Sequence, residues 1–377
     1  MENPVNYEPE DDSGNGLYCW WRSASEFQGT GRLDIDISRA AEAGPRMRVL
    51  REMERLAMVA PEGLDDLRHK LLSYRPGDFW VPMGGLKKEE LDIPPIVTIL
   101  LVGFSKSGKS SLVNLMYSVL GRAGLIPFAQ TAGSSSNYET LFMEEHNVLR
   151  SMRNGFCVYD SRGLSYYEIT QSLEELSEWM IDGVHHHLRC SRGRGSESSD
   201  GFALSAQLSS SKFTRRRVNC AVVVVDMSYV YKSLIAGDST PLEATKELFC
   251  SHSLRKCNEN PILILSHGDL LNTDERIDGR IKICQFLGIS ETTGVYDISC
   301  VTEHGFLPEE ADPVSAYALT EALYRVLLFS DRTHPPGRRW KDHIVEFLYW
   351  ILCCISAFFA FLAYYFSKLG KQKMKRL

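Results

Sequence analysis

The segment Gly103–Ser110 fits the pattern G-x-x-x-x-G-K-S, and its chemistry can be inferred from the residues alone. The apolar run Pro95–Val102 precedes it, and the helix-like stretch Ser111–Tyr117 follows it. A buried strand that leads through a glycine loop into a helix N-terminus directs backbone N–H groups towards phosphate oxygens. Lys109 would add a cation, and the Ser110 hydroxyl could bind Mg²⁺. We therefore predict a phosphate-binding loop formed by Gly103, Ser105, Lys106, Ser107, Gly108, Lys109, Ser110 and Ser111.

Three shorter polar segments follow predicted strands further along the chain: Asp160–Gly163, Ser266–Asp269 and Ser299–Cys300. With the phosphate-binding loop, they have the order and spacing of the nucleotide-binding motifs of Ras-like GTPases. Over about residues 92–330 the sequence resembles this class of P-loop NTPases, nearest the septin-like branch with the chloroplast import receptor GTPases of plants. The resemblance implies an α/β fold of the Ras-like P-loop type, with GTP and Mg²⁺ as ligands.

On the phosphate side, the resemblance assigns a role to each matching residue. Asp160 would hold Mg²⁺ through water, and the Gly163 N–H would meet the γ-phosphate. A threonine from a loop that orders on binding should complete the metal site, together with Ser110. Thr131 and Thr140 are both candidates, and we favour Thr131 because it begins a polar, flexible stretch.

On the base side, Asp269 would select guanine, because a carboxylate can accept from two adjacent N–H donors that adenine does not present. Ser266 stands where the family has Asn or Thr, and His267 replaces a lysine that stacks on the base. The import receptor branch is similar in using histidine there. Ser299 and Cys300 resemble the loop whose backbone contacts the guanine oxygen. An ATP-preferring enzyme remains the alternative.

The position that carries a water-orienting glutamine in fast Ras-like enzymes is Leu164 in this chain. We therefore expect slow hydrolysis, with Lys109 and Gly163 contributing to catalysis. Additional positive charge would come from Arg162, or from an arginine of a second subunit or an activating partner. A structural role is the alternative for Arg162.

The elements that must position these residues alternate between strand and helix, which predicts a mostly parallel sheet covered on both faces. An edge strand is expected within Tyr138–Arg150. The other predicted strands are Asn154–Tyr159, Cys220–Met227, Pro261–Ser266 and Val295–Ser299, and the predicted helices are Pro241–Cys257, Asp274–Leu287 and Pro313–Ser330.

Composition divides the rest of the chain. Residues 1–35 are acidic and predicted to be disordered, and residues 36–91 form a helical extension with two helices within about 38–76. These helices are expected to pack on the nucleotide domain, 92–330, in preference to another molecule. A basic insertion at 185–217 is predicted to be disordered. The net charge of −6 argues against nucleic acid as the main partner.

The C-terminal part contains 20 uncharged residues, Phe347–Phe366, which as a helix would span about 30 Å, the thickness of a bilayer core. A linker, 331–346, precedes this transmembrane segment, and a basic tail, 367–377, follows it. The short tail predicts a tail anchor that contacts membrane lipid and leaves the nucleotide domain in the cytosol. The membrane would be that of the endoplasmic reticulum, or the outer membrane of a mitochondrion, plastid or peroxisome.

These expectations combine into a membrane-anchored GTP-binding protein with slow GTP hydrolysis, acting as a switch or an assembling scaffold. It would work as a homodimer or with an activating protein partner. A scaffold that binds nucleotide without hydrolysis is the second interpretation. A P-loop kinase is disfavoured, because no arginine-rich lid is evident.

Overall fold

The computed structural model describes residues 19–27, 33, 44–82, 87–121, 129, 140, 142–149, 155–190, 214–255, 260–299, 312–335 and 340–374. The chain divides into two compact units. The first comprises Met1–Val81 with Pro94–Thr333, and the second comprises Pro82–Ile93 with His334–Leu377. The predicted nucleotide-binding segments all belong to the first unit.

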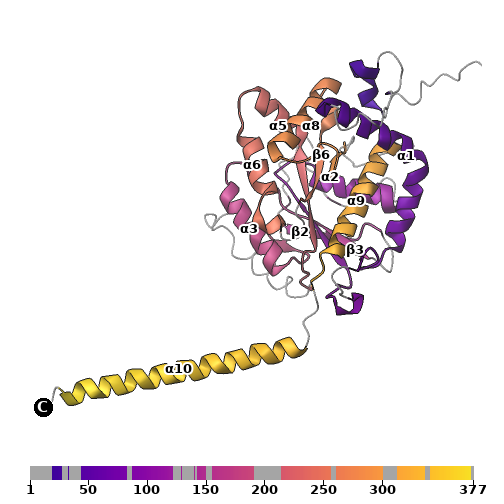
Figure 1. Cartoon of the computed structure of the whole chain (residues 1–377). Helices are drawn as coiled ribbons and strands as arrows, with labels where there is room; N and C mark the ends of the chain where they lie inside the picture. Colours follow the sequence, from indigo (N-terminus) through magenta and orange to yellow (C-terminus); the bar gives the residue numbers. More distant parts are fainter. Residues whose placement is uncertain are drawn as a thin grey trace, which may run out of the picture. The chain divides into compact units, whose positions relative to one another are not determined.

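A seven-stranded sheet in the order β4-β2-β3-β1-β5-β6-β7 forms the centre of the first unit (Figure 1). Strands β3, β1, β5, β6 and β7 are parallel, whereas β2 runs antiparallel to β3 and β4 runs antiparallel to β2. The mostly parallel α/β sheet is therefore confirmed. The strands are β1 (Val97–Val102), β2 (Phe142–His146), β3 (Phe156–Asp160), β4 (Leu188–Arg189), β5 (Cys220–Asp226), β6 (Ile262–Ser266) and β7 (Val295–Asp297).

Helices cover both faces of this sheet, because successive strand residues point into two separate cores. One core lies under α1, α2 and α9, and the other lies under α3, α5 and α6; α8 contributes to both. Fully buried strands with apolar side chains on both faces are typical of parallel sheets. The helices of this unit are α1 (Pro45–Ser73), α2 (Lys109–Gly121), α3 (Ile169–Asp182), α5 (Met227–Ile235), α6 (Thr240–Phe249), α7 (His252–Arg255), α8 (Thr273–Leu287) and α9 (Pro313–Arg332).

The N-terminal extension forms one helix of 29 residues, α1, and the prediction of two helices was wrong. Pro61 lies inside α1 and lacks the N–H that a helix interior normally uses. Buried residues before and after it, such as Met53 and Leu64, lie along the same helix. Since α1 packs along α9, tertiary contacts on both sides of Pro61 hold the helix continuous. As expected, this helix packs on the domain at 92–330, because α1 contacts α9 and α8.

Three further differences concern element boundaries. The strand within Tyr138–Arg150 is not an edge strand, because β4 pairs outside β2. Helix α5, which begins directly after β5, was not predicted. Asp226 caps it by accepting a hydrogen bond from the Tyr229 N–H at 2.9 Å. The helix expected at Pro241–Cys257 is divided into α6 and α7.

The two segments predicted to be disordered lie partly outside the described residues. Within the N-terminal segment, Trp20–Ser23 and Ser25–Phe27 form 3-10 turns, η2 and η3. Within the basic insertion, β4 is formed, and Arg216 forms a bridge with Val184. Residues 191–213 of the insertion are outside the described part.

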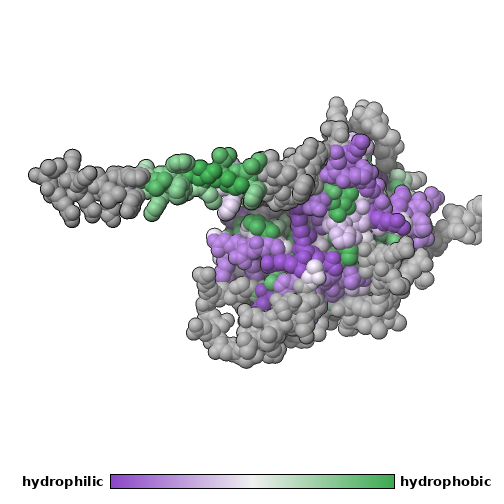
Figure 2. All heavy atoms as spheres, turned by 90° about the horizontal axis from the view of Figure 1, so that it is seen from below, coloured by the Kyte–Doolittle hydropathy of each residue, from purple (hydrophilic) through white to green (hydrophobic). Residues whose placement is uncertain are grey.

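The second unit contains α10 (Trp340–Met374), a helix of 35 residues. Its window Phe347–Tyr364 has a mean hydropathy of 2.1, and none of that window is buried. Figure 2 shows the apolar side chains gathered along this part of α10. By length and composition, α10 is the one helix in the described ranges that could cross a membrane. The predicted linker is shorter than expected, because α9 extends to Arg332 and α10 begins at Trp340.

Candidate functional site

The loop between β1 and α2 has the backbone conformation of an anion-binding turn. Lys106 has φ 64° and Gly108 has φ 82°, and both values lie in the left-handed region. Left-handed residues within a turn make successive N–H groups converge on a concave surface, which binds anions. Gly103 is required for close approach, since a Cβ there would lie 2.2 Å from the Val224 carbonyl oxygen of β5. The predicted phosphate-binding loop is thus seated directly against the centre of the sheet.

Lys109 at the start of α2 is buried and bends back over this loop. Its Nζ donates hydrogen bonds to the carbonyl oxygens of Gly103 at 3.1 Å and Phe104 at 3.0 Å. Burial lowers the pKa of Lys109 to about 8, opposed by the negative charge of Asp160. A phosphate oxygen would be a stronger partner for the ammonium than these neutral carbonyls, because it carries a negative charge that attracts the ammonium strongly in a buried site.

Ser110 and Asp160 meet at the end of β3. The Ser110 hydroxyl donates to Asp160 Oδ2 at 2.5 Å, while Asp160 Oδ1 is buried without a hydrogen-bond partner. Burial raises the pKa of Asp160, and the nearby Lys109 opposes this. A hydroxyl beside a carboxylate with an unpartnered oxygen fits the ligands that Mg²⁺ prefers. Ser110 and Asp160, two of the predicted metal ligands, are therefore brought together.

Glu144 on β2 is a carboxylate near this site that the sequence prediction missed. It lies directly opposite Asp160 in the antiparallel register, and such pairs have Cβ atoms about 4.5–5.5 Å apart. The neighbouring His146 imidazole lowers the pKa of Glu144, whose Oε2 lies 3.6 Å from His146 Nε2. The sequence shows only that an acidic residue lies within the predicted strand. The pairing of β2 with β3 is needed to place it next to Asp160.

The segment after Asp160 pairs with the phosphate-binding loop. The Leu164 N–H donates to the Gly103 carbonyl at 3.0 Å, and the Ser105 N–H donates to the Leu164 carbonyl at 2.9 Å. Position 163 requires glycine, because a Cβ there would lie 2.4 Å from Ser105 Cα. The Leu164 side chain is fully buried in the core. An apolar, buried side chain cannot orient a water molecule by hydrogen bonding.

Arg162, predicted as a catalytic cation, is held by a neighbouring helix. Its Nη2 donates to Glu175 Oε2 of α3 at 2.5 Å, and the Arg162 side chain is 15 % exposed. The guanidinium would have to leave Glu175 before it could contact a phosphate. The geometry therefore favours the structural role over the catalytic one.

The predicted base-recognition segment lies against the phosphate-binding loop. Ser266 Oγ is 2.8 Å from the Ser107 carbonyl oxygen and 3.1 Å from that of Val225, and its hydroxyl proton can be donated to either. His267 has φ 56°, and a Cβ on Gly108 would lie 3.3 Å from its Cε1. Its Nδ1 lies 3.5 Å from Asp226 Oδ2. The Ser266 side chain thus connects the two segments.

Asp269 is exposed in the short turn η6 (Gly268–Leu270), where its carboxylate is accessible to a ligand. Ser299 follows β7, and its Oγ accepts a hydrogen bond from Arg276 at 2.8 Å. Thr131 and Cys300 lie outside the described residues, whereas Thr140 lies two residues before β2. The structure therefore places the described part of the base side at the same edge of the sheet as the phosphate side.

An ion pair that the sequence prediction missed lies beneath the base-recognition segment. Arg276 of α8 donates two hydrogen bonds of 2.7 Å to Asp297 of β7, and both side chains are buried. A Cβ on Gly268 would lie 2.5 Å from Arg276 Nε. The backbone between His267 and Asp269 thus rests on the guanidinium. The signal in the sequence was an acidic residue within an apolar strand.

No family model matches the chain, and no curated protein matches it. Solved structures with a similar fold include a probable GTP-binding protein EngB, which is 17 % identical with a TM-score of 0.33, covering 61 % of this chain and 98 % of that one.

Two further solved structures are similar to the chain. A dimerisation-deficient mutant of Toc33 from Arabidopsis thaliana is 15 % identical with a TM-score of 0.32, covering 74 % of this chain and 96 % of that one. A signal recognition particle receptor complex, SRb-GTP/SRX from Chaetomium thermophilum, is 14 % identical with a TM-score of 0.27, covering 55 % and 90 %. At these scores the site must be interpreted from the chain's own geometry.

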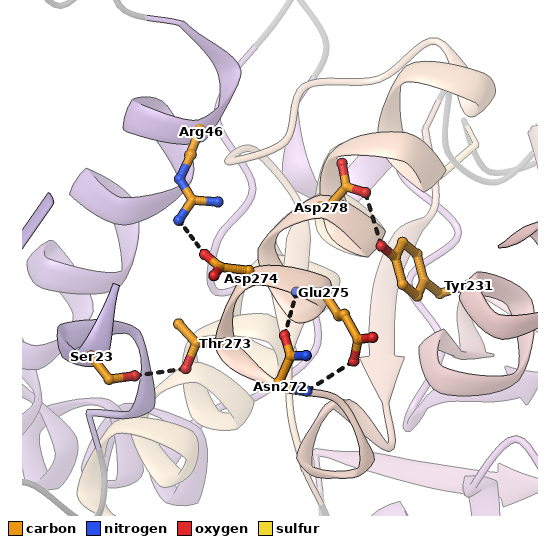
Figure 3. A pocket seen from close by; sticks show the side chains of 8 residues that line it. All are labelled: Ser23, Arg46, Tyr231, Asn272, Thr273, Asp274, Glu275 and Asp278. Carbon is orange, nitrogen blue, oxygen red and sulfur yellow. Dashed lines mark hydrogen bonds and ion pairs between the residues drawn. The ribbon is translucent and has the colours of Figure 1, made fainter. Parts of the chain in front are cut away.

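A separate pocket of about 570 Å³ lies at the N-terminal end of α8 (Figure 3). Its lining includes Asp274, Glu275 and Asp278, and none of the predicted nucleotide-binding residues. Arg46, its lining cation, is already paired with Glu26 and Asp274. This acidic lining disfavours a phosphate, and the pocket is distinct from the candidate nucleotide site.

Proposed function

We propose that this protein binds GTP with Mg²⁺ at the carboxyl edge of its sheet and hydrolyses GTP slowly while α10 holds it at a membrane. The observation that carries the proposal is the convergence of three segments distant in the sequence. Ser110 bonds to Asp160, and Ser266 bonds to the Ser107 carbonyl, so that the three predicted motifs meet at one loop.

The triphosphate would lie on the loop Gly103–Ser110, with its charge balanced by Lys109. Ser110 and Asp160 would hold Mg²⁺, which when bound neutralises charge on the phosphate oxygens. The unpartnered Asp160 Oδ1 supports this assignment, because a buried oxygen without a partner costs free energy that a ligand sphere can offset. We keep Thr131 as the switch threonine in the proposal and Thr140 as its alternative.

Guanine selection would come from Asp269, which is exposed beside His267. The imidazole lies next to Gly108 and can stack on a base whose phosphates occupy the loop. Ser299 and Cys300 would contact the base from the β7 side. If Asp269 makes no such contact with the base, the alternative is an ATP-preferring enzyme.

Hydrolysis requires water to attack the γ-phosphorus while the bond to the β-phosphate oxygen breaks, giving GDP and phosphate. Lys109 and the Gly163 N–H would stabilise charge on the phosphoryl oxygens. Leu164 is buried and cannot orient the water, so turnover of the isolated protein should be slow. Arg162 would contribute only if it left Glu175, and a second subunit or a protein partner could supply an arginine instead.

The same buried Leu164 favours a second candidate function, a nucleotide-binding membrane scaffold without useful hydrolysis. Both candidates place the nucleotide-binding unit on the cytosolic side, where GTP and Mg²⁺ are available. The membrane would be the endoplasmic reticulum or the outer membrane of a mitochondrion, plastid or peroxisome. Imaging a fluorescent fusion of residues 335–377 tests the membrane assignment.

The decisive experiment measures the affinity of the purified full-length protein in detergent for mant-GTP and mant-ATP, with and without Mg²⁺. We expect tighter binding of mant-GTP, strengthened by Mg²⁺. Equal affinities would refute guanine selection, and the absence of binding of either nucleotide would refute the whole proposal. Single-turnover release of γ-phosphate, at low and at high protein concentration, then separates the slow GTPase from the scaffold.

A further inference from the structure

The N-terminal turn η2 packs against the helix that supports the base-recognition segment. The Trp20 ring lies over the guanidinium of Arg276, with 4.0 Å between Arg276 Cζ and the ring centroid. Two further contacts fix η2 to α8. Thr273 Oγ1 donates to the Trp20 carbonyl at 3.2 Å, and Ser23 Oγ lies 2.7 Å from Thr273 Oγ1 (Figure 3).

The same Arg276 connects this turn to the predicted guanine-binding loops. Its guanidinium makes the paired hydrogen bonds to Asp297 and the bond to Ser299 described above. It also supports the backbone at Gly268, one residue before Asp269. A continuous path of contacts therefore leads from Trp20 through Arg276 to both base-side loops.

The contact has a clear electrostatic consequence. Arg276 is buried, and its positive charge is stabilised by the Asp297 carboxylate and by the aromatic face of Trp20. An aromatic ring over a guanidinium attracts the cation and excludes water from its hydrogen bonds. Without the ring, water would compete for the Arg276 donors, and the loops that rest on them would become less ordered.

The neighbouring residues hold Trp20 in this position. The next residue, Trp21, is fully buried in the core beneath α1, α2 and α9. Arg22 pairs with Glu54 of α1 at 3.6 Å. The turn is thus attached to both α1 and α8, which makes it a part of the folded unit.

We propose that Trp20 is a positioning residue for guanine binding, acting through Arg276 on the loops that carry Asp269 and Ser299. This inference rests on the proposed function. It extends the site to a residue about 250 positions away in the sequence. A partner or a modification that displaces η2 would weaken binding of the base while leaving the phosphate-binding loop intact.

The test compares the full-length protein with Trp20→Ala and Trp20→Phe, using mant-GTP and inorganic tripolyphosphate as ligands. We expect Trp20→Ala to weaken mant-GTP binding about fivefold, the effect of losing one partly exposed cation–π contact, with tripolyphosphate affinity unchanged. Trp20→Phe keeps an aromatic face and should restore most of the affinity. Trp80→Ala, which removes a partly exposed tryptophan from the loop after α1, is the matched control and should leave both affinities unchanged.

Hydrogen exchange of the protein without nucleotide provides a measurement that does not depend on the proposed function. In Trp20→Ala, amides of residues 266–271 and 295–299 should exchange faster, while those of α2 should not change. Ser23→Ala, which removes one contact of η2 without changing the ring, should show a smaller effect in the same peptides.

The outcomes are separable. Equal losses of mant-GTP and tripolyphosphate affinity would show a general structural role and overturn the inference. Unchanged mant-GTP affinity in Trp20→Ala, with binding by the unmodified protein, would also overturn it while the proposed function stands. If the unmodified protein binds no guanine nucleotide, the proposed function fails. In that case, unchanged hydrogen exchange of residues 266–271 and 295–299 in Trp20→Ala would reject the inference as well.

Discussion

The phosphate side and the base side of the candidate site lie at one edge of the sheet but are built differently. Most of the phosphate side is one continuous segment, Gly103–Ser110, shaped by left-handed backbone at Lys106 and Gly108. The base side depends on side chains from separate elements, and Arg276 of α8 joins them through its hydrogen bonds to Asp297 and Ser299. A short motif can therefore specify the first, whereas the second exists only after the chain has folded.

This difference predicts separable failures. Changes in the phosphate-binding loop should remove binding of every phosphate ligand, whereas changes on the base side should alter selectivity and leave tripolyphosphate binding intact. Four experiments test this separation.

Lys109→Ala should weaken binding of GTP and of tripolyphosphate by at least about 100-fold, because a buried charge-assisted partner of the phosphates is lost. Fluorescence titration with mant-GTP at pH 7 and calorimetry with tripolyphosphate measure the two losses. Lys246→Ala removes an exposed lysine from α6 and serves as the control. Retention of affinity in Lys109→Ala, with an unchanged thermal unfolding curve, would contradict the assignment of the loop.

Asp269→Asn should reduce the preference for GTP over ATP by about 10-fold to 100-fold, because the amide cannot accept from both guanine donors. Tripolyphosphate affinity should not change, since the side chain lies on the base side. Competition between mant-GTP and unlabelled ATP gives the ratio. Asp182→Asn, an exposed carboxylate at the end of α3, is the matched control. A fall in tripolyphosphate affinity would break the separation between the two sides.

GTP affinity should fall about tenfold between pH 7 and pH 9, because burial lowers the pKa of Lys109 to about 8. The unliganded protein loses this proton as the pH rises through 8, and the phosphates favour its return, so binding takes up a proton above that pH. Calorimetry in buffers of different ionisation enthalpy measures the uptake. Asp269→Asn should keep the same pH dependence of GTP affinity. If the pH dependence disappears in Asp269→Asn, Lys109 is not its source.

The same pKa has a consequence for stability. Lys109 has a lower pKa in the folded chain than in the unfolded chain, so the unfolded chain binds more protons between about pH 8 and 10.5. Its contribution to the free energy of unfolding therefore increases with pH across that window.

Ser266→Ala should weaken GTP binding about fivefold, the effect of losing one hydrogen bond of about 1 kcal/mol to the Ser107 carbonyl. This residue joins the two sides, so tripolyphosphate affinity should fall slightly as well. Ser266→Thr keeps the hydroxyl and should retain most of the affinity. If Ser266→Ala has no effect on either ligand, the two sides are not connected through this bond.

Sequence reasoning predicted most of the fold because its signals are local. Short, valine-rich apolar runs such as Val97–Val102 and Cys220–Asp226 are typical of buried strands, and the loop after β1 carries its own backbone requirements at Gly103 and Gly108. The parallel sheet with helices on both faces follows from the alternation of these elements.

The rest depends on contacts between distant residues. The apolar pattern predicted two helices within about 38–76, but packing along α9 keeps α1 continuous across Pro61. The register that sets Glu144 opposite Asp160 is a property of the assembled sheet. Arg276 and Asp297 carry no motif, and their pairing appears only when α8 lies beside β7.

The stack of aromatic rings beside the phosphate-binding loop provides an optical signal. The Phe104 and Tyr166 rings lie 3.8 Å apart between centroids, and Tyr166 also contacts Tyr229, which is 40 % exposed. Phe104 and Tyr166 each lie within two residues of the hydrogen bond between the Leu164 N–H and the Gly103 carbonyl, so we expect a ligand that separates these segments to move the two rings apart. Near-ultraviolet circular dichroism of the unlabelled protein would then report such rearrangement without an attached dye.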